Sequence, residues 1–117
     1  MKPLWFIKIA LCLFLLPSLA LAEEPYKGSL EKARSLDKEE FFEDAINYWQ
    51  KTLDENPPPS IILYAKLKLT NTYSHLGQLD KAVEVSRSLT ESNPDHYDSW
   101  FHFANSLAAL KQYSQAA

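Results

Sequence analysis

The sequence is poor in the residues that build disulfides, phosphate-binding loops and metal sites. Its 117 residues include one cysteine and two glycines. A lone cysteine cannot form an intramolecular disulfide, and the isolated Gly28 and Gly77 cannot supply a Gly-rich phosphate loop. The sequence also lacks the Gly-x-Ser-x-Gly elbow of a hydrolase and the His-Glu-x-x-His helix of a zinc peptidase. We therefore expect no cofactor, no metal site and no enzymatic activity.

Two groups of polar residues could be mistaken for chemical sites. The only cluster that suggests metal ligands consists of His75, Asp95, His96, Asp98 and His102. His96 falls in a connector and His102 about two turns into the next helix, so their side chains do not converge on one ion. The four carboxylates within residues 39–44 fall at a turn and a helix start, where acidic side chains favour the positive end of the helix dipole. We expect both groups to be solvated surface residues.

The one long apolar run lies at the N-terminus. Two lysines accompany an unbroken apolar run over residues 9–16, and the tripeptide Ala-Leu-Ala ends at Ala22. Lys8 and Pro17 leave too short a clean run for a membrane-spanning helix, which needs about 20 apolar residues. The pattern predicts a secretory signal peptide over residues 1–22, cleaved near Ala22. We expect export across the inner membrane of a bacterium into the periplasm.

Cleavage would leave an acidic chain without cysteine. It removes Cys12 and two of the twelve basic residues, but none of the fifteen acidic residues, so the net charge becomes −5. Without a basic patch, the mature chain is a poor partner for nucleic acid or for anionic lipid. We expect a protein or peptide partner, and neither nucleic acid nor a small-molecule substrate.

After a polar leader over residues 23–25, the chain alternates amphipathic helical runs with short breaks. Residues 63–94 read as two helices joined by a turn at Gly77, and the second ends before Pro94. An earlier pair spans residues 26–59, with Glu39-Glu40 in the place of the turn glycine and three prolines as a rigid connector. The apolar positions that share a face in the 63–94 pair are Leu69, Tyr73, Leu76, Leu79, Ala82, Val85 and Leu89.

The units recur at nearly constant intervals. Equivalent residues of the second and third units, such as Leu69 and Phe103, lie 34 positions apart. Ala45 and Ala82, in the first and second units, lie 37 apart. The first interval is therefore three residues longer than the second, and we assign the extra residues to the proline connector.

The run Leu69-x3-Tyr73-x3-Gly77-x-Leu79-x2-Ala82, closed by Pro94, resembles a tetratricopeptide repeat (TPR). The resemblance implies an all-α fold in which antiparallel helix hairpins stack into a right-handed solenoid. It places about two and a half units over residues 26–117, at about 26–59, 63–96 and an incomplete 97–117. A Sel1-like helical array is the alternative: the 37-residue interval favours it, whereas the 34-residue interval opposes it.

In the TPR family, the first helix of each unit lines a concave groove that binds peptides or partner helices. Asn71 and Asn105 match at equivalent places, and their amides can both donate to and accept from a peptide backbone. Tyr64 and Phe101 are expected to point away from the core and to anchor a partner. The residues that some chaperone-binding TPRs use to clamp two carboxylates are incomplete here, so we do not expect C-terminal carboxylates to be recognised in that manner. The full partner-binding set implied by the resemblance is Arg34, Tyr64, Leu67, Asn71, His75, Phe101, His102 and Asn105.

The remaining aromatic residues are expected to pack in the core and between units. They are Phe41, Phe42, Tyr48, Trp49, Tyr73, Trp100 and Phe103.

The expected function is that of an exported scaffold or adaptor in the cell envelope. The third unit stops where its second helix should begin, so we expect the sequence to be the N-terminal part of a longer protein. The alternatives are the N-terminal TPR region of a larger exported enzyme, such as a peptidase, and a structural protein that self-associates through the incomplete third unit.

Overall fold

The computed structural model describes residues 24–116, and the predicted signal peptide lies outside the described residues. The described part of the chain contains helices and no strands, which confirms the predicted all-α class. None of these helices is both long enough and apolar enough to cross a membrane. The helices, in chain order, are α2 (Pro25–Lys38), α3 (Phe42–Asp54), α4 (Pro59–His75), α5 (Leu79–Ser92) and α6 (Tyr97–Ala116).

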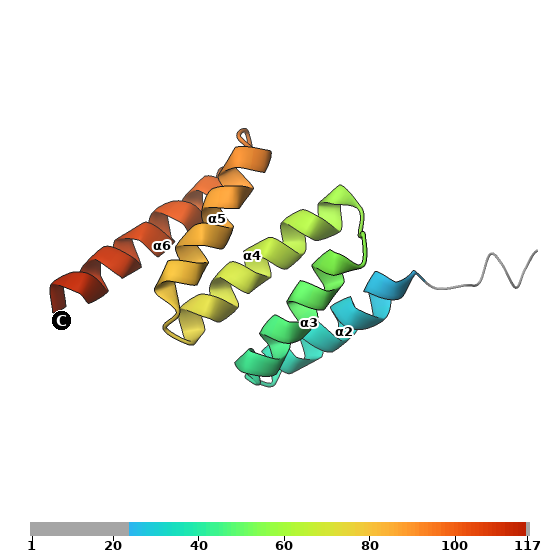
Figure 1. The fold of residues 1–117 in the computed structure, drawn as a ribbon. Helices are drawn as coiled ribbons and strands as arrows, with labels where there is room; N and C mark the ends of the chain where they lie inside the picture. The colour runs from blue at the N-terminus through green and yellow to red at the C-terminus, as the bar shows by residue number, and fades with distance from the viewer. Residues whose placement is uncertain (1–23, 117) are drawn as a thin grey trace, which may run out of the picture.

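Successive helices pack against one another in a row (Figure 1). The helices α2 and α3 form one hairpin, α4 and α5 form a second, and α6 lies along α5. The two hairpins meet chiefly where α3 packs on α4. The short turns between consecutive helices make antiparallel neighbours the natural arrangement.

The two hairpin turns have the same backbone geometry. Two residues beyond the end of α4, Gly77 has φ 73°, and two residues beyond the end of α2, Glu40 has φ 65°. In each turn the next amide donates to the carbonyl five residues earlier, from Phe41 to Leu36 and from Gln78 to Tyr73, both at 2.9 Å. This is the Schellman arrangement, in which a left-handed residue satisfies the last carbonyls of a helix. Glu40 therefore occupies the structural place of Gly77, as its sequence position predicts.

Replacing Glu40 with glycine should stabilise the protein by about 1 kcal/mol, because a left-handed backbone costs a residue with a Cβ about that much. The midpoint of urea unfolding measures the change. Glu39→Gly is the matched control, since Glu39 has φ −83° and gains nothing from glycine. We expect this control to lower the midpoint. A lower midpoint for Glu40→Gly would show that the glutamate side chain stabilises the turn more than the backbone strains it.

A buried apolar cluster extends from α2 to α5. It contains four fully buried alanines, Ala33, Ala45, Ala65 and Ala82, and the fully buried Trp49. The alanines allow the helices to approach closely, and the large indole fills the space that remains between them. Burial raises the pKa of the Tyr73 phenol in the same cluster, although a hydrogen bond from Gln50 opposes the shift. The core therefore lies within the two hairpins.

The last helix, α6, packs through smaller and more polar side chains than those of the buried apolar cluster. Ser99 and Ser106 are buried on α6, and Arg87 of α5 lies 5.7 Å from the centroid of the Phe103 ring. No residue of α6 belongs to the buried apolar cluster of the described chain. Large side chains instead stay exposed along α6, namely Tyr97, Trp100, Phe101, Leu107 and Tyr113.

Two aromatic residues do not lie where the sequence pattern places them. Phe41 is 55% exposed, because it is the residue before the first turn of α3 and the buried face starts after it. Trp100 is 47% exposed, whereas its neighbour Ser99 is buried; the Trp100 indole Nε1 donates to the Pro94 carbonyl at 2.7 Å. The prediction that both pack in the core is wrong.

A proline connector joins the two hairpins. Pro57 is buried, and Pro58 precedes α4 with extended backbone at φ −65° and ψ 161°. Pro59 is the first residue of α4 and does not belong to the connector as predicted. Proline suits this first helical position, because the amide hydrogen it lacks would have no partner within the helix. Asn56 begins the connector in the left-handed region, at φ 54°, which asparagine tolerates.

Candidate functional site

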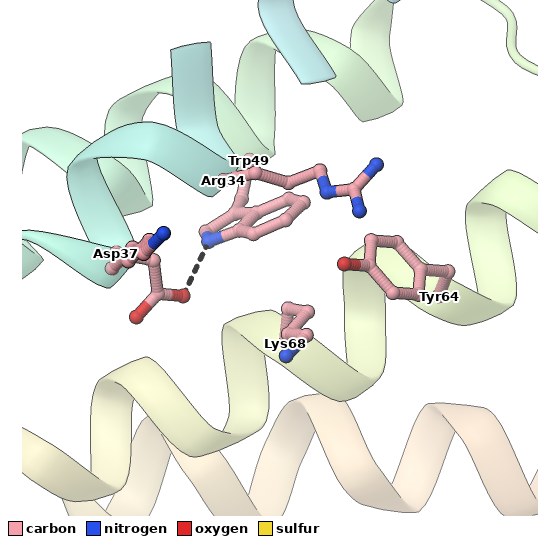
Figure 2. A pocket seen from close by; sticks show the side chains of 6 residues that line it. Arg34, Asp37, Trp49, Tyr64 and Lys68 are labelled. Atoms are coloured by element: carbon pink, nitrogen blue, oxygen red, sulfur yellow. Dashed lines mark hydrogen bonds between the residues drawn. The ribbon is translucent and has the colours of Figure 1, made fainter. Parts of the chain in front are cut away.

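A cavity of ≈ 440 Å³ opens where α2, α3 and α4 meet (Figure 2). The helix α2 contributes Arg34, Asp37 and Lys38, whose spacing of three and four residues places them on one helix face. The helix α4 contributes Tyr64 and Lys68, again four residues apart, and α3 contributes Trp49. The cavity therefore combines three cations, one carboxylate and two aromatic rings.

Asp37, which lines the cavity, joins the three helices through hydrogen bonds. The indole Nε1 of Trp49 donates to Oδ2 of Asp37 at 3.0 Å (Figure 2). The hydroxyl of Thr72, on α4, lies 2.9 Å from the same oxygen and 2.7 Å from the Lys68 carbonyl, so its single proton is shared between two acceptors. Because Trp49 and Thr72 are both fully buried, their donors need a partner inside the protein. The carboxylate of Asp37 is thus engaged with structural donors.

Tyr64 forms an aromatic wall of the cavity. Its ring meets Trp49 edge-on, with centroids 5.8 Å apart and an interplanar angle of 69°. Arg34 Cζ and Lys68 Nζ each lie 5.7 Å from the Tyr64 centroid. An aromatic ring attracts cations over its face, so Tyr64 holds the two positive charges near each other. Figure 2 shows Arg34 reaching from the α2 side towards this ring.

The expectation that Tyr64 points away from the core is wrong. Its side chain is half-buried and packs against the buried apolar cluster. The reason is the large indole of Trp49, which reaches the gap between the hairpins and meets the face of α4 that carries Tyr64. Tyr64 nevertheless lines the cavity, with its ring available to the cations.

Of the eight residues implied by the TPR resemblance, Arg34 and Tyr64 come together in the cavity. His75 lies elsewhere: it is exposed and stacks on Phe42, with centroids 4.8 Å apart and planes 2° from parallel. Phe101 is 49% exposed and stacks on Tyr97 on α6, with centroids 6.2 Å apart. None of the other four residues lines the cavity. Leu67 and His102 are half-buried, and Asn71 and Asn105 are exposed.

The sequence pattern missed two of the three cations. Lys38 follows Arg34 by four residues, and Lys68 follows Tyr64 by four, so each lies one helical turn beyond a residue that was identified. This four-residue spacing is the sequence signal that could have identified both lysines. The contact between Asp37 and Thr72 joins residues 35 positions apart, and no local pattern reports it.

The described residues offer no group of three or more His, Cys, Asp or Glu side chains that could hold a metal ion. Comparisons with protein-family models, with curated proteins and with solved structures found no match.

Proposed function

We propose that this chain is a TPR-type interaction module whose α2, α4 and α6 line one concave face that binds a peptide or a partner helix. The matched hairpin turns at Glu40 and Gly77 and the 34- and 37-residue intervals support a repeated hairpin unit. In such an array the first helix of each hairpin faces the groove. Export to the cell envelope is part of the proposal and rests on the pattern of residues 1–22.

The observation that carries the binding role is the cavity between α2 and α4. Side chains of consecutive first helices converge there, yet they leave ≈ 440 Å³ open. Pockets with an aromatic wall and a few well-placed polar groups are the usual form of a recognition site. A scaffold or adaptor would use this site without catalysing a reaction.

Site-specific photocrosslinking in the producing cells tests this function. A photoreactive amino acid at the exposed Asn71 of α4 should give an adduct with a distinct second protein, and that adduct should weaken when Arg34 is also replaced with glutamine. The same photoreactive residue at Glu84, exposed on the second helix of its hairpin, is the control and should give none. Equal labelling from both positions would overturn the proposal. Adducts between two copies of this chain would instead identify self-association.

A further inference from the structure

The cavity between α2 and α4 holds more positive charge than its own residues balance. Arg34, Lys38 and Lys68 line it together with a single carboxylate, Asp37. One oxygen of that carboxylate already accepts from the buried indole of Trp49 and lies beside the Thr72 hydroxyl. One carboxylate offsets one of the three positive charges, so the cavity lining keeps a net positive charge.

Tyr64 concentrates two of these charges. Because Arg34 Cζ and Lys68 Nζ each lie 5.7 Å from one ring centroid, they lie within about twice that distance of each other. Like charges at this separation repel at the edge of a protein, where the effective dielectric constant is well below that of water. An anionic group that enters the cavity beside either cation would relieve that repulsion.

The donor set favours carboxylates. The planar guanidinium of Arg34 presents paired donors that match a carboxylate in bidentate geometry, and each lysine adds a point charge. The cations come from two helices, so a segment with two or more acidic side chains could engage both walls of the cavity. Nucleic acid fits poorly, because the chain is acidic overall and the Tyr64 ring already meets two cations and an indole edge.

We infer that the cavity formed by Arg34, Lys38, Trp49, Tyr64 and Lys68 binds an acidic segment of a partner protein through its Asp or Glu side chains. The inference rests on the proposed binding function and specifies the chemistry of its ligand. Charge complementarity of this kind chiefly sets specificity and association rate.

Titration of the protein followed by NMR of the tryptophan indole groups tests the inference. The probe is a hexaglutamate peptide blocked at both ends, so that its only carboxylates are side chains. The indole signal of Trp49, which lines the cavity, should shift, and that of Trp100 should stay fixed. The shift should shrink markedly between 50 and 500 mM salt, because screening shortens the range of charge interactions.

A double variant isolates the cations. Arg34→Gln with Lys68→Gln should weaken hexaglutamate binding by about tenfold. Lys32→Gln with Lys111→Gln is the matched control: it changes the net charge equally, at exposed positions outside the cavity, and should leave the affinity unchanged. Circular dichroism of both variants verifies that they remain helical.

Three results would overturn the inference. They are an equal loss of affinity in the control variant, an equal Trp49 shift with blocked hexalysine, and no shift with hexaglutamate. A shift produced by inorganic phosphate or by a neutral peptide with a free C-terminus, but not by hexaglutamate, would assign the cavity to a different anion. In either case the Asn71 crosslink to a partner would survive, so a wrong ligand class can be told apart from a wrong binding function.

Discussion

Replacing Trp49 with alanine should lower the free energy of unfolding by about 3–5 kcal/mol, the cost of deleting a large aromatic side chain from a packed core. Trp49 is 0% exposed and belongs to the cluster that joins the hairpins. Its loss would leave a cavity among alanines that cannot expand to fill it, and would remove the edge contact with Tyr64. Urea unfolding followed by circular dichroism measures the change.

Trp100→Ala is the matched control, because it deletes the same side chain from a position that is 47% exposed. We expect it to cost about 1 kcal/mol, since partial exposure forfeits much of the burial gain and the hydrogen bond to Pro94 is at the surface. If Trp49→Ala leaves no folded protein, Trp49→Phe retains most of the packing and gives a measurable loss. Similar losses for Trp49→Ala and Trp100→Ala would mean that the core does not depend on Trp49.

Removing the carboxylate of Asp37 should cost about 2 kcal/mol of stability, because Asp37→Ala leaves the buried indole N–H of Trp49 without an acceptor. The hydroxyl of Thr72 can still donate to the Lys68 carbonyl, so the unsatisfied indole is the main loss. The variant also brings Arg34, Lys38 and Lys68 together without the carboxylate among them. Urea unfolding at low salt is the appropriate measurement, since salt screens the repulsion among the cations.

The variant Asp37→Asn separates the contribution of the hydrogen bond from that of the negative charge. The amide oxygen can still accept from the indole, so the hydrogen-bond loss should largely disappear and only the charge change remains. We expect Asp37→Asn to recover more than half of the stability that Asp37→Ala loses. If the two variants are equally unstable, the charge of Asp37 matters more than its hydrogen bonds.

The helices could be predicted from sequence because each pattern is local. An apolar stripe with helical period identifies the runs that became α2 to α5, and Gly77 with its counterpart Glu40 identifies the turns. Both depend on residues within a few positions of each other. The all-α class and the place of the turns follow from such local information.

The cavity could not be predicted in the same way, because it depends on how far apart the hairpins lie. Helical phase shows that Tyr64 and Lys68 share a face of α4, but not that Trp49 reaches that face from α3. The misplacement of Phe41 has a different origin: Phe41 is the residue before α3, so it lies outside the helical face that packs in the core. Spacing between the hairpins is a tertiary property, and it determined the cavity.

The prolines at positions 57, 58 and 59, where the connector leads into α4, bear on how readily the cavity binds its partner. Each fixes its own φ and restricts the residue before it, so the connector retains few conformations even in the unfolded chain. The distance between the two cations of α2 and Lys68 of α4 is thus set with little entropic cost on folding. A partner would meet a site that is already arranged, and its association would need little ordering of this protein.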